Sequence, residues 1–265
     1  MDWSDTALIL SLGRFREADI WVRMLTRRHG IVSAFAFGGS RSRKRFCGCL
    51  DICNELQIST RTTRNGQYLS LLEGNLIQGP HRLRTDLNRL GMFMNCVRFL
   101  EALGVPPDGL GGPDGLGGSV TAFLLLKDTL SLLEEADTIQ DIFPVLFRLR
   151  LASQQGYAPA LDKCVSCGRP IEGAAGFLVA EGCLVCPECS AKRGNIVEIS
   201  GKSLDVLRQV QEKSPAQWHF VTSVSSEGSE GALLPAERRE CARAVDGFVQ
   251  YHLGMSWDKG RFRRV

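Results

Sequence analysis

The sequence predicts an α+β fold in which a small five-stranded barrel precedes an α-helical domain with a compact, cysteine-rich insertion. Three observations lead to this prediction. Short apolar runs separated by turn residues fill the first 80 positions, as in a small all-β domain. From position 81 onward, apolar residues recur at three- and four-residue spacing, which is the period of a helix buried on one face. C-x2-C pairs then gather between Cys164 and Cys189.

The composition is that of an ordinary globular protein with room for two cores. The chain has 265 residues, of which 44% are hydrophobic, so it is long enough for two modest domains. Its longest apolar run, from Ala122 to Leu126, ends at Lys127, and acidic residues rather than basic ones lie near Met1. We therefore expect no membrane span and no secretory leader, and we predict a cytoplasmic protein.

Five strand candidates make up the N-terminal region, which we place at residues 1–79. Each is a short apolar run, and each is bounded by glycine, proline or polar turn residues. Five short antiparallel strands favour a closed barrel of the OB type, because five is its strand number and closure removes exposed edges. The candidates are Thr6–Leu12, Asp19–Thr26, Ile31–Phe37, Phe46–Thr60 and Gly66–Ile77, the last two joined by the turn Thr63–Gly66.

The remaining residues, 80–265, are predicted to be helical around the cysteine-rich insertion. Apolar residues spaced by three and four positions give the first helix one apolar face. The glycine- and proline-rich segment Gly104–Gly118 and the polar segment Ser223–Gly231 are interpreted as loops. The predicted helices are His81–Leu103, Val120–Glu135, Ile139–Gln155, Ser203–Glu212 and Pro235–Leu253.

The spacing of the cysteines indicates a metal chemistry. Cys164 and Cys167 form one C-x2-C pair, and Cys183, Cys186 and Cys189 follow. Zinc prefers four tetrahedral sulfur ligands, and two such pairs complete a closed site without an open catalytic position. The segment 162–192 is therefore predicted to be a zinc ribbon that holds one structural ion.

Three cysteines compete for the second pair. Pairing Cys183 with Cys186 leaves 15 residues after Cys167, whereas pairing Cys186 with Cys189 leaves 18, and both spacings fit a ribbon. A proline follows Cys186 and favours a tight turn, whereas the two residues after Cys183 are strand formers. Two alternatives stay open. In one, Cys183 replaces Cys189 as a metal ligand, and in the other the cysteines bind no metal and are unrelated buried or disulfide-bonded residues. We interpret the ligands as Cys164, Cys167, Cys186 and Cys189, and Cys47, Cys49, Cys53, Cys96 and Cys241 as small buried hydrophobes.

Basic residues concentrate in the predicted barrel. The net charge of the whole chain is only +3. The segment from Arg14 to Arg45, however, contains nine Arg or Lys residues and only two acidic residues, which gives it a local net charge of +7. Cations displace counterions from phosphates, and aromatic rings stack on unpaired bases. A solvated charged loop is the alternative interpretation. The candidate nucleic-acid contacts are Arg14, Arg16, Arg27, Arg28, Arg41, Arg43, Lys44 and Arg45.

Two further groups of residues are not assigned a role. Aromatic residues on strands usually belong to a core, and at least one of Phe35 and Phe37 is expected to point inward. The basic segment from Lys259 to Arg264 either extends the basic surface or is a frayed, solvated tail.

Enzyme motifs are missing from the sequence. There is no phosphate-loop, GxGxxG, HExxH or Gly-x-Ser-x-Gly pattern, and the four histidines are scattered. A non-enzymatic protein is therefore predicted, and an enzyme with an unrecognised metal site is an alternative. An RNA-binding or translation-associated OB and zinc-ribbon protein is a second alternative, because composition does not separate RNA from DNA.

Several segments, taken in their order along the chain, resemble the RecO family of bacterial recombination mediators. The resemblance covers most of the chain and rests on the order of the segments rather than on any one of them. They are Ala7–Leu10, Arg16–Asp19, Leu25–Gly30, Gly38–Arg41, Gln155–Leu161 leading into Cys164–Gly168, and Cys186–Cys189.

The resemblance implies an N-terminal OB domain and a helical C-terminal domain with an inserted zinc ribbon. It implies a protein that binds single- and double-stranded DNA at the nucleoid and anneals complementary strands without hydrolysing nucleotide. It also implies work with RecR to load RecA on DNA coated by single-strand binding protein. Some members lack the cysteines, which implies a structural zinc, and Cys183 stands where a glycine is expected. The four cysteine ligands and the arginines of the hairpin turn and of the 41–45 loop carry over as site residues.

Overall fold

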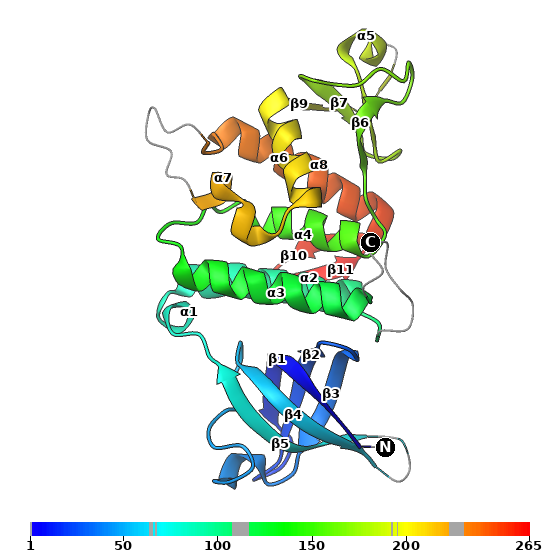
Figure 1. Cartoon of the computed structure of the whole chain (residues 1–265). Helices are drawn as coiled ribbons and strands as arrows, with labels where there is room; N and C mark the ends of the chain where they lie inside the picture. The colour runs from blue at the N-terminus through cyan, green and yellow to red at the C-terminus, as the bar shows by residue number, and fades with distance from the viewer. Residues whose placement is uncertain are drawn as a thin grey trace. The chain divides into compact units, whose positions relative to one another are not determined.

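The computed structural model describes residues 2–63, 66, 68–107, 117–191, 193–194, 196–222 and 231–265 (Figure 1). The chain forms two compact units, one made of residues 1–87 with 104–130 and the other of residues 88–103 with 131–265. The barrel strands end at Gln78, and the domain boundary near residue 79 stays a prediction.

The first unit contains a closed five-stranded barrel, drawn in blue to cyan in Figure 1. The strand order is β1-β2-β3-β5-β4, and pairing of β1 with β4 completes the circle. β3 and β5 run parallel, and the other neighbours are antiparallel. This is the OB topology, so the predicted fold class is confirmed. The strands are β1 (Asp2–Arg14), β2 (Ile20–Thr26), β3 (Gly30–Ala36), β4 (Glu55–Thr62) and β5 (Leu69–Gln78).

The barrel interior is filled by residues that alternate along the strands, as the two-residue period of a strand requires. Small side chains on β3 leave room for larger ones from β2 and β4. Burying such a side chain contributes roughly 1.5–3 kcal/mol relative to leaving it in water. The core residues are Ala7, Ile9, Val22, Met24, Ala34, Ala36, Phe46, Cys49, Leu56, Ile58 and Leu71.

The predicted strand Phe46–Thr60 is wrong over its first nine positions, since β4 begins at Glu55. Cys47 and Cys53 have φ angles of 30° and 66°, which are incompatible with an extended strand. Phe46 and Cys49 are nevertheless buried in the barrel core. The apolar pattern that suggested a strand belongs to a loop that packs into the barrel.

Helices dominate the rest of the chain, as predicted. The single helix expected from His81 is divided at Asp86, whose backbone is extended (φ −113°, ψ 104°). The other boundaries lie within a few residues of the predicted ones. The helices are α1 (Arg82–Thr85), α2 (Leu87–Leu103), α3 (Gly118–Glu135), α4 (Phe143–Gln154), α6 (Gly201–Glu212), α7 (His219–Thr222) and α8 (Pro235–Leu253), with short 3₁₀ turns at Gly39–Arg41 and Pro215–Gln217.

Two buried arginines tie the helices of the second unit together. Arg89 on α2 donates hydrogen bonds to the carbonyls of Leu133 (2.6 Å) and Asp137 (2.7 Å), near the C-terminal end of α3, where carbonyls lack helical partners. Arg148 on α4, only 5% exposed, donates to the Asp246 carboxylate of α8 and to Asn95 of α2. Removing one partner of such a buried charge would leave the other unpaired and is strongly destabilising.

A four-stranded sheet carries the cysteine-rich insertion. Its order is β6-β8-β7-β9, with β6 and β8 parallel and the other pairs antiparallel. The strands are β6 (Ala160–Cys164), β7 (Ala175–Leu178), β8 (Cys183–Val185) and β9 (Ile196–Ile199), and the short helix α5 (Pro187–Ser190) follows β8.

The basic segment near residue 260 is not a frayed tail. It forms an antiparallel hairpin of β10 (Met255–Asp258) and β11 (Arg261–Arg264). The turn between the strands contains Lys259 and Gly260, both with positive φ.

Parts of three predicted connections lie outside the described residues. These are Arg64 and Asn65 of the predicted turn, 108–116 of the glycine-rich loop and 223–230 of the polar segment. Among the helices of the described part of the chain, none combines the length and the hydropathy that a membrane crossing requires.

Candidate functional site

Six of the eight predicted contact cations lie at one end of the barrel, one at the end of β1 and five in two loops. Arg14 and Arg16 lie where β1 leads into β2, and the other four follow the end of β3. The two loops are joined by hydrogen bonds from the Ser40 amide to the Ala18 carbonyl (3.1 Å) and from the Gly38 amide to Asp19 Oδ1 (2.8 Å). All six cations are exposed: Arg14, Arg16, Arg41, Arg43, Lys44 and Arg45.

Little of this positive charge is neutralised within the barrel. Arg41 lies 3.5 Å from Glu17, but both side chains are more than 70% exposed, so the pair is worth little. Arg45 donates to the carbonyl of Phe37 and lies over the ring of Phe46, which orients its guanidinium without cancelling its charge. The two loops therefore present a basic surface toward solvent.

Four aromatic side chains form a continuous strip next to these loops. Phe35 on β3 lies at its centre, with ring centroids 5.1 Å from Phe15, 6.1 Å from Phe37 and 5.6 Å from Tyr68. Tyr68 reaches Phe35 because β3 and β5 pair in parallel, with Ala34 opposite Leu69. Phe35 is half-buried, whereas Phe15, Phe37 and Tyr68 are 53%, 45% and 55% exposed. The Arg16 guanidinium lies over the Phe15 ring. We call Phe15, Phe35, Phe37 and Tyr68 the aromatic strip.

The aromatic strip corrects the expectation that Phe35 or Phe37 points inward. Their neighbours Ala34 and Ala36 occupy the inward positions and are fully buried. Because both alternations of β3 are apolar, the sequence pattern did not show which one faces the core. Tyr68 was missed altogether, since it precedes β5 with no motif around it.

Arg27 and Arg28 lie at the other end of the β2–β3 hairpin from the two basic loops. The hairpin register pairs Ile20 with Ala36 at one end and Thr26 with Gly30 at the other, a separation of roughly 20 Å for strands that rise about 3.3 Å per residue. The structure therefore does not bring these two arginines to the end of the barrel where the other six cations lie.

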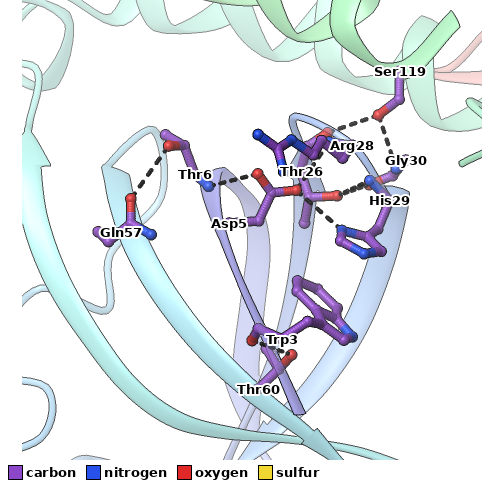
Figure 2. Close-up of polar contacts among 10 residues, drawn as sticks. All are labelled: Trp3, Asp5, Thr6, Thr26, Arg28, His29, Gly30, Gln57, Thr60 and Ser119. Atoms are coloured by element: carbon purple, nitrogen blue, oxygen red, sulfur yellow. Dashed lines mark hydrogen bonds and ion pairs between the residues drawn. The ribbon is translucent and has the colours of Figure 1, made fainter. Parts of the chain in front are cut away.

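A buried polar network holds the turn that carries Arg27 and Arg28 (Figure 2). Asp5, whose side chain is 5% exposed, accepts hydrogen bonds from the amides of Thr6 and Arg28, both at 2.9 Å, and lies 3.1 Å from His29 Nδ1. The ring of His29 stacks on Trp3 at 3.9 Å. The network fixes the path of the turn, so both arginine side chains start from an ordered backbone.

Ser119 satisfies the buried groups on the other side of the same turn (Figure 2). Its hydroxyl donates to the Thr26 carbonyl and accepts from the Gly30 amide, both at 2.8 Å. Gly30 has φ 67°, and a side chain at that position would lie 2.2 Å from the Val105 carbonyl. Glycine is therefore required both by the backbone angle and by space.

Four cysteines in the ribbon lie close enough to share one metal ion. The Sγ atoms of Cys164, Cys167, Cys186 and Cys189 all lie within 4.8 Å of one another. The Sγ atoms of Cys167 and Cys186 are 3.9 Å apart, close to the roughly 3.8 Å edge of a tetrahedron with metal–sulfur bonds of about 2.3 Å. The donor set and its spacing therefore fit a tetrahedral ion.

Two tight backbone turns bring the four thiols of this cluster together. The amide of Gly168, which has φ 71°, donates to the Cys164 carbonyl at 2.8 Å and closes the first turn. The second turn begins α5 at a proline, with the Cys189 amide bonded to the Cys186 carbonyl at 3.0 Å. These are the tight turns that let two thiolates from one loop reach the same ion.

Hydrogen bonds already favour a thiolate at part of the cluster. The Cys186 amide donates to Cys164 Sγ at 3.4 Å, and this contact is the largest of several hydrogen bonds that lower the pKa of Cys164 to about 6. Arg169 donates to Cys167 Sγ and also lowers its pKa. A hydrogen bond between the thiols of Cys189 and Cys186 is the main cause that raises the pKa of Cys189, so this thiol must lose a proton when a cation binds.

Cys183 is not part of the cluster. It lies at the start of β8, where it is 8% exposed and contacts the carboxylate of Glu181. Burial raises the pKa of its thiol. The structure thus groups the four cysteines of the preferred set and leaves Cys183 in the sheet.

The fold and the site together define the class of protein. A closed OB barrel with exposed cations and aromatics, linked to a helical unit with a four-cysteine ribbon, is the arrangement implied by the sequence resemblance. The comparisons with known proteins agree at both ends of the chain. The model described as Recombination protein O N terminal matches residues 1–80, and the one described as Recombination protein O C terminal matches residues 119–261. The chain belongs to the RecO family of DNA repair proteins.

Relatives from other bacteria match along the whole chain. The DNA repair protein RecO of Nitratidesulfovibrio vulgaris is 50% identical over 270 residues, covering 100% of both chains. That of Lawsonia intracellularis is 45% identical, again over 100% of both. The protein of the same name from Anaeromyxobacter dehalogenans is 29% identical over 97% of this chain and 94% of its own. The predicted family is therefore confirmed, with a role in DNA repair and recombination.

Replacing Asp5 by Asn should destabilise the barrel, because an amide cannot accept all three hydrogen bonds of the carboxylate. We expect a loss of about 1–3 kcal/mol in the free energy of unfolding, typical of a buried group left unsatisfied. The measurement is denaturant unfolding of the full chain. Asp2→Asn is the matched control on the same strand, where the exposed ion pair with Arg61 should contribute much less. Equal effects of the two substitutions would contradict the role given to Asp5.

Cys186→Ser should abolish metal binding, and Cys183→Ser should leave it intact. The reason is that Cys186 has its Sγ in the cluster, whereas the thiol of Cys183 lies in the sheet. Metal content per chain, measured by elemental analysis after purification, distinguishes the two. Metal retention should also fall as the pH is lowered, because protons compete with the cation for the thiolates. Loss of metal in Cys183→Ser would instead favour the alternative ligand set.

Proposed function

We propose that this chain binds single- and double-stranded DNA, anneals complementary strands, and works with RecR to load RecA on DNA coated by single-strand binding protein. Family membership supports a role in DNA repair and recombination. The finer activities are those implied by the resemblance to recombination mediators. The protein acts at the nucleoid in the cytoplasm and is not an enzyme in this proposal.

The aromatic strip carries the proposal. OB barrels bind oligonucleotides beside the loops that join β1 to β2 and β4 to β5. Phe15 lies in the first of these loops and Tyr68 at the end of the second. Base stacking on an aromatic ring is worth about 1–3 kcal/mol per base and tolerates any sequence, because every base has a π face. The six neighbouring cations can follow the phosphate chain.

Annealing follows from the same chemistry. Two strands repel each other through their phosphates, and bound cations reduce that repulsion by displacing counterions. Neither binding nor pairing requires bond cleavage, so no catalytic residue is needed.

The metal in this proposal is zinc in a structural role. Four thiolates form a closed tetrahedral set, which is the usual ligand set of structural zinc. When bound, the ion joins the turn after β6 to the start of α5, and the protein residues leave no coordination position for a substrate. Arg169, paired with Glu188 and bonded to Cys167, holds one ligand in place from outside the cluster.

Phe15→Ala with Tyr68→Ala should weaken binding of a single-stranded oligonucleotide at least tenfold, because two stacking contacts are lost. Duplex affinity should fall less, since its bases are already stacked. Fluorescence anisotropy on the full chain measures both. Leu76→Ala with Ile77→Ala, which are also exposed apolar side chains of the barrel, is the control and should bind normally. Unchanged single-strand affinity in the first variant would count against the proposal.

A competition experiment distinguishes DNA from RNA as the ligand. Single-stranded DNA and RNA of one sequence are added against a labelled DNA probe at several salt concentrations. The proposal expects DNA to compete at least as well as RNA. Clear preference for RNA would favour the translation-associated alternative.

Removing zinc should loosen the ribbon without abolishing the strand contact of the barrel. The ion is structural in this proposal, and its binding energy is folding energy of the ribbon. Limited proteolysis after chelation should cut near residues 165–190, while the oligonucleotide affinity of the intact chain stays within a few-fold. A complete loss of DNA binding on chelation would contradict this separation of roles.

A further inference from the structure

The β10–β11 hairpin presents a second ordered basic surface, within the helical unit. Its turn and second strand carry four exposed cations, Lys259, Arg261, Arg263 and Arg264. One acidic residue, Asp258, lies in the hairpin and pairs with Arg263 at 3.1 Å. Within the part of the chain that the structure describes, the other three cations form no ion pair. Their charge is available to a polyanion.

The hairpin is anchored, so its cations are held in place. The Phe262 ring packs against Phe99 of α2 at 5.1 Å and lies beneath the Arg148 guanidinium at 5.0 Å. Arg98 donates a hydrogen bond to the Gly260 carbonyl at 2.6 Å, and Met255 is buried. Alternation along β11 places Arg261 and Arg263 on the face opposite Phe262, away from these packing contacts.

An indole ring lies on the face of the hairpin that carries Phe262, and alternation along β11 places Arg264 on that face too. Trp257 is paired across the hairpin with Phe262, at a centroid distance of 4.9 Å, and remains 39% exposed. By contrast, Trp218 in the helical core is 1% exposed. A partly exposed ring supported on one side by another ring offers its remaining surface to a flat partner.

We propose that the β10–β11 hairpin is a second contact for single-stranded nucleic acid, distinct from the aromatic strip of the barrel. Unpaired cations on a hairpin that also carries a partly exposed indole, with Arg264 on the same face as Trp257, fit a phosphate chain with unstacked bases. An acidic peptide or a duplex would leave the indole unused. The inference extends the proposed function, because annealing requires two strands, and one chain with two strand contacts can hold both.

The test neutralises the three available cations in the full chain, as Lys259→Gln, Arg261→Gln and Arg264→Gln together. Binding of oligo(dT) is measured over a range of salt concentrations. On single strands, each phosphate contact contributes roughly 0.7 to the steepness of log affinity against log salt. Losing three contacts should therefore make this slope less steep by about 2. The annealing rate of complementary oligonucleotides should fall at least tenfold.

The matched control removes the same amount of positive charge elsewhere in the same unit. It combines Lys163→Gln, Arg239→Gln and Arg243→Gln, three cations that are also exposed but lie outside the hairpin. Because the net charge of the two variants is equal, a difference between them reports the position of the cations rather than their number. The control should keep the salt slope and the annealing rate of the unmodified chain.

Photocrosslinking distinguishes nucleic acid bound at the hairpin from nucleic acid bound at the aromatic strip. An oligonucleotide that contains iododeoxyuridine should crosslink to the peptide that includes Trp257, and Trp257→Leu should remove that crosslink. The crosslink should persist in Phe15→Ala with Tyr68→Ala, where the aromatic strip is impaired. Unchanged unfolding midpoints confirm that each variant is folded.

The outcomes distinguish failure of this inference from failure of the proposed function. If the hairpin variant matches its control in salt slope and annealing while the barrel variant loses binding, the hairpin inference is overturned and the proposed function stands. If the unmodified chain binds no oligonucleotide, the proposed function itself fails. The hairpin variant could also lose binding to an acidic peptide or to anionic vesicles while its DNA binding is unchanged. That result would overturn the inference that the hairpin binds nucleic acid.

Discussion

One long strand, β1, sets the geometry on which the barrel depends. Its 13 residues pair with β4 from Asp2 to Leu8 and with β2 from Ala7 to Arg14. A register shift between Ile9 and Ser11 bends the strand where it passes from one partner to the other, as a β-bulge does. Closure of the barrel through β1 decides which side chains of every other strand face outward.

The same strand links the two ends of the barrel. Near its beginning, Asp5 accepts hydrogen bonds from the turn of the β2–β3 hairpin, and near its end the chain enters the loop with Phe15. The polar network therefore supports Arg27 and Arg28, and the basic loops form at the opposite end. Backbone pairing, rather than attraction between charges, positions the cations, since like charges repel one another.

Sequence reasoning succeeded where a pattern has one physical solution. The proline after Cys186 favours the tight turn that the second pair of thiolates needs. The helix from Pro235 to Leu253 begins at a proline and ends before Gly254 in the left-handed region, both typical boundary signals. It failed where two solutions fit the pattern equally well. Phe46 and Cys49 are apolar enough for a strand, yet positive φ at nearby cysteines makes the segment a loop.

The site was only partly predictable for the same reason. Charge can be counted along a sequence, so the cations were found, but their distribution over the two ends of the barrel depends on strand register. The orientation of Phe35 depends on Ala34 and Ala36 filling the interior, and that choice is made by packing across the barrel. The basic segment at 259–264 forms a hairpin because Phe262 packs on Phe99, a contact between residues far apart in the chain.

Stacking on aromatic side chains has a consequence for how the proposed annealing would end. An aromatic ring competes with neighbouring bases for the π face of an unpaired base, and in a duplex those faces are already covered. Pairing of two bound strands therefore removes the stacking contacts at the moment the product forms, while the cation contacts remain and weaken with salt. A protein that combines exposed rings with cations can thus hold single strands more tightly than their duplex, and it can release the product without the energy of nucleotide hydrolysis.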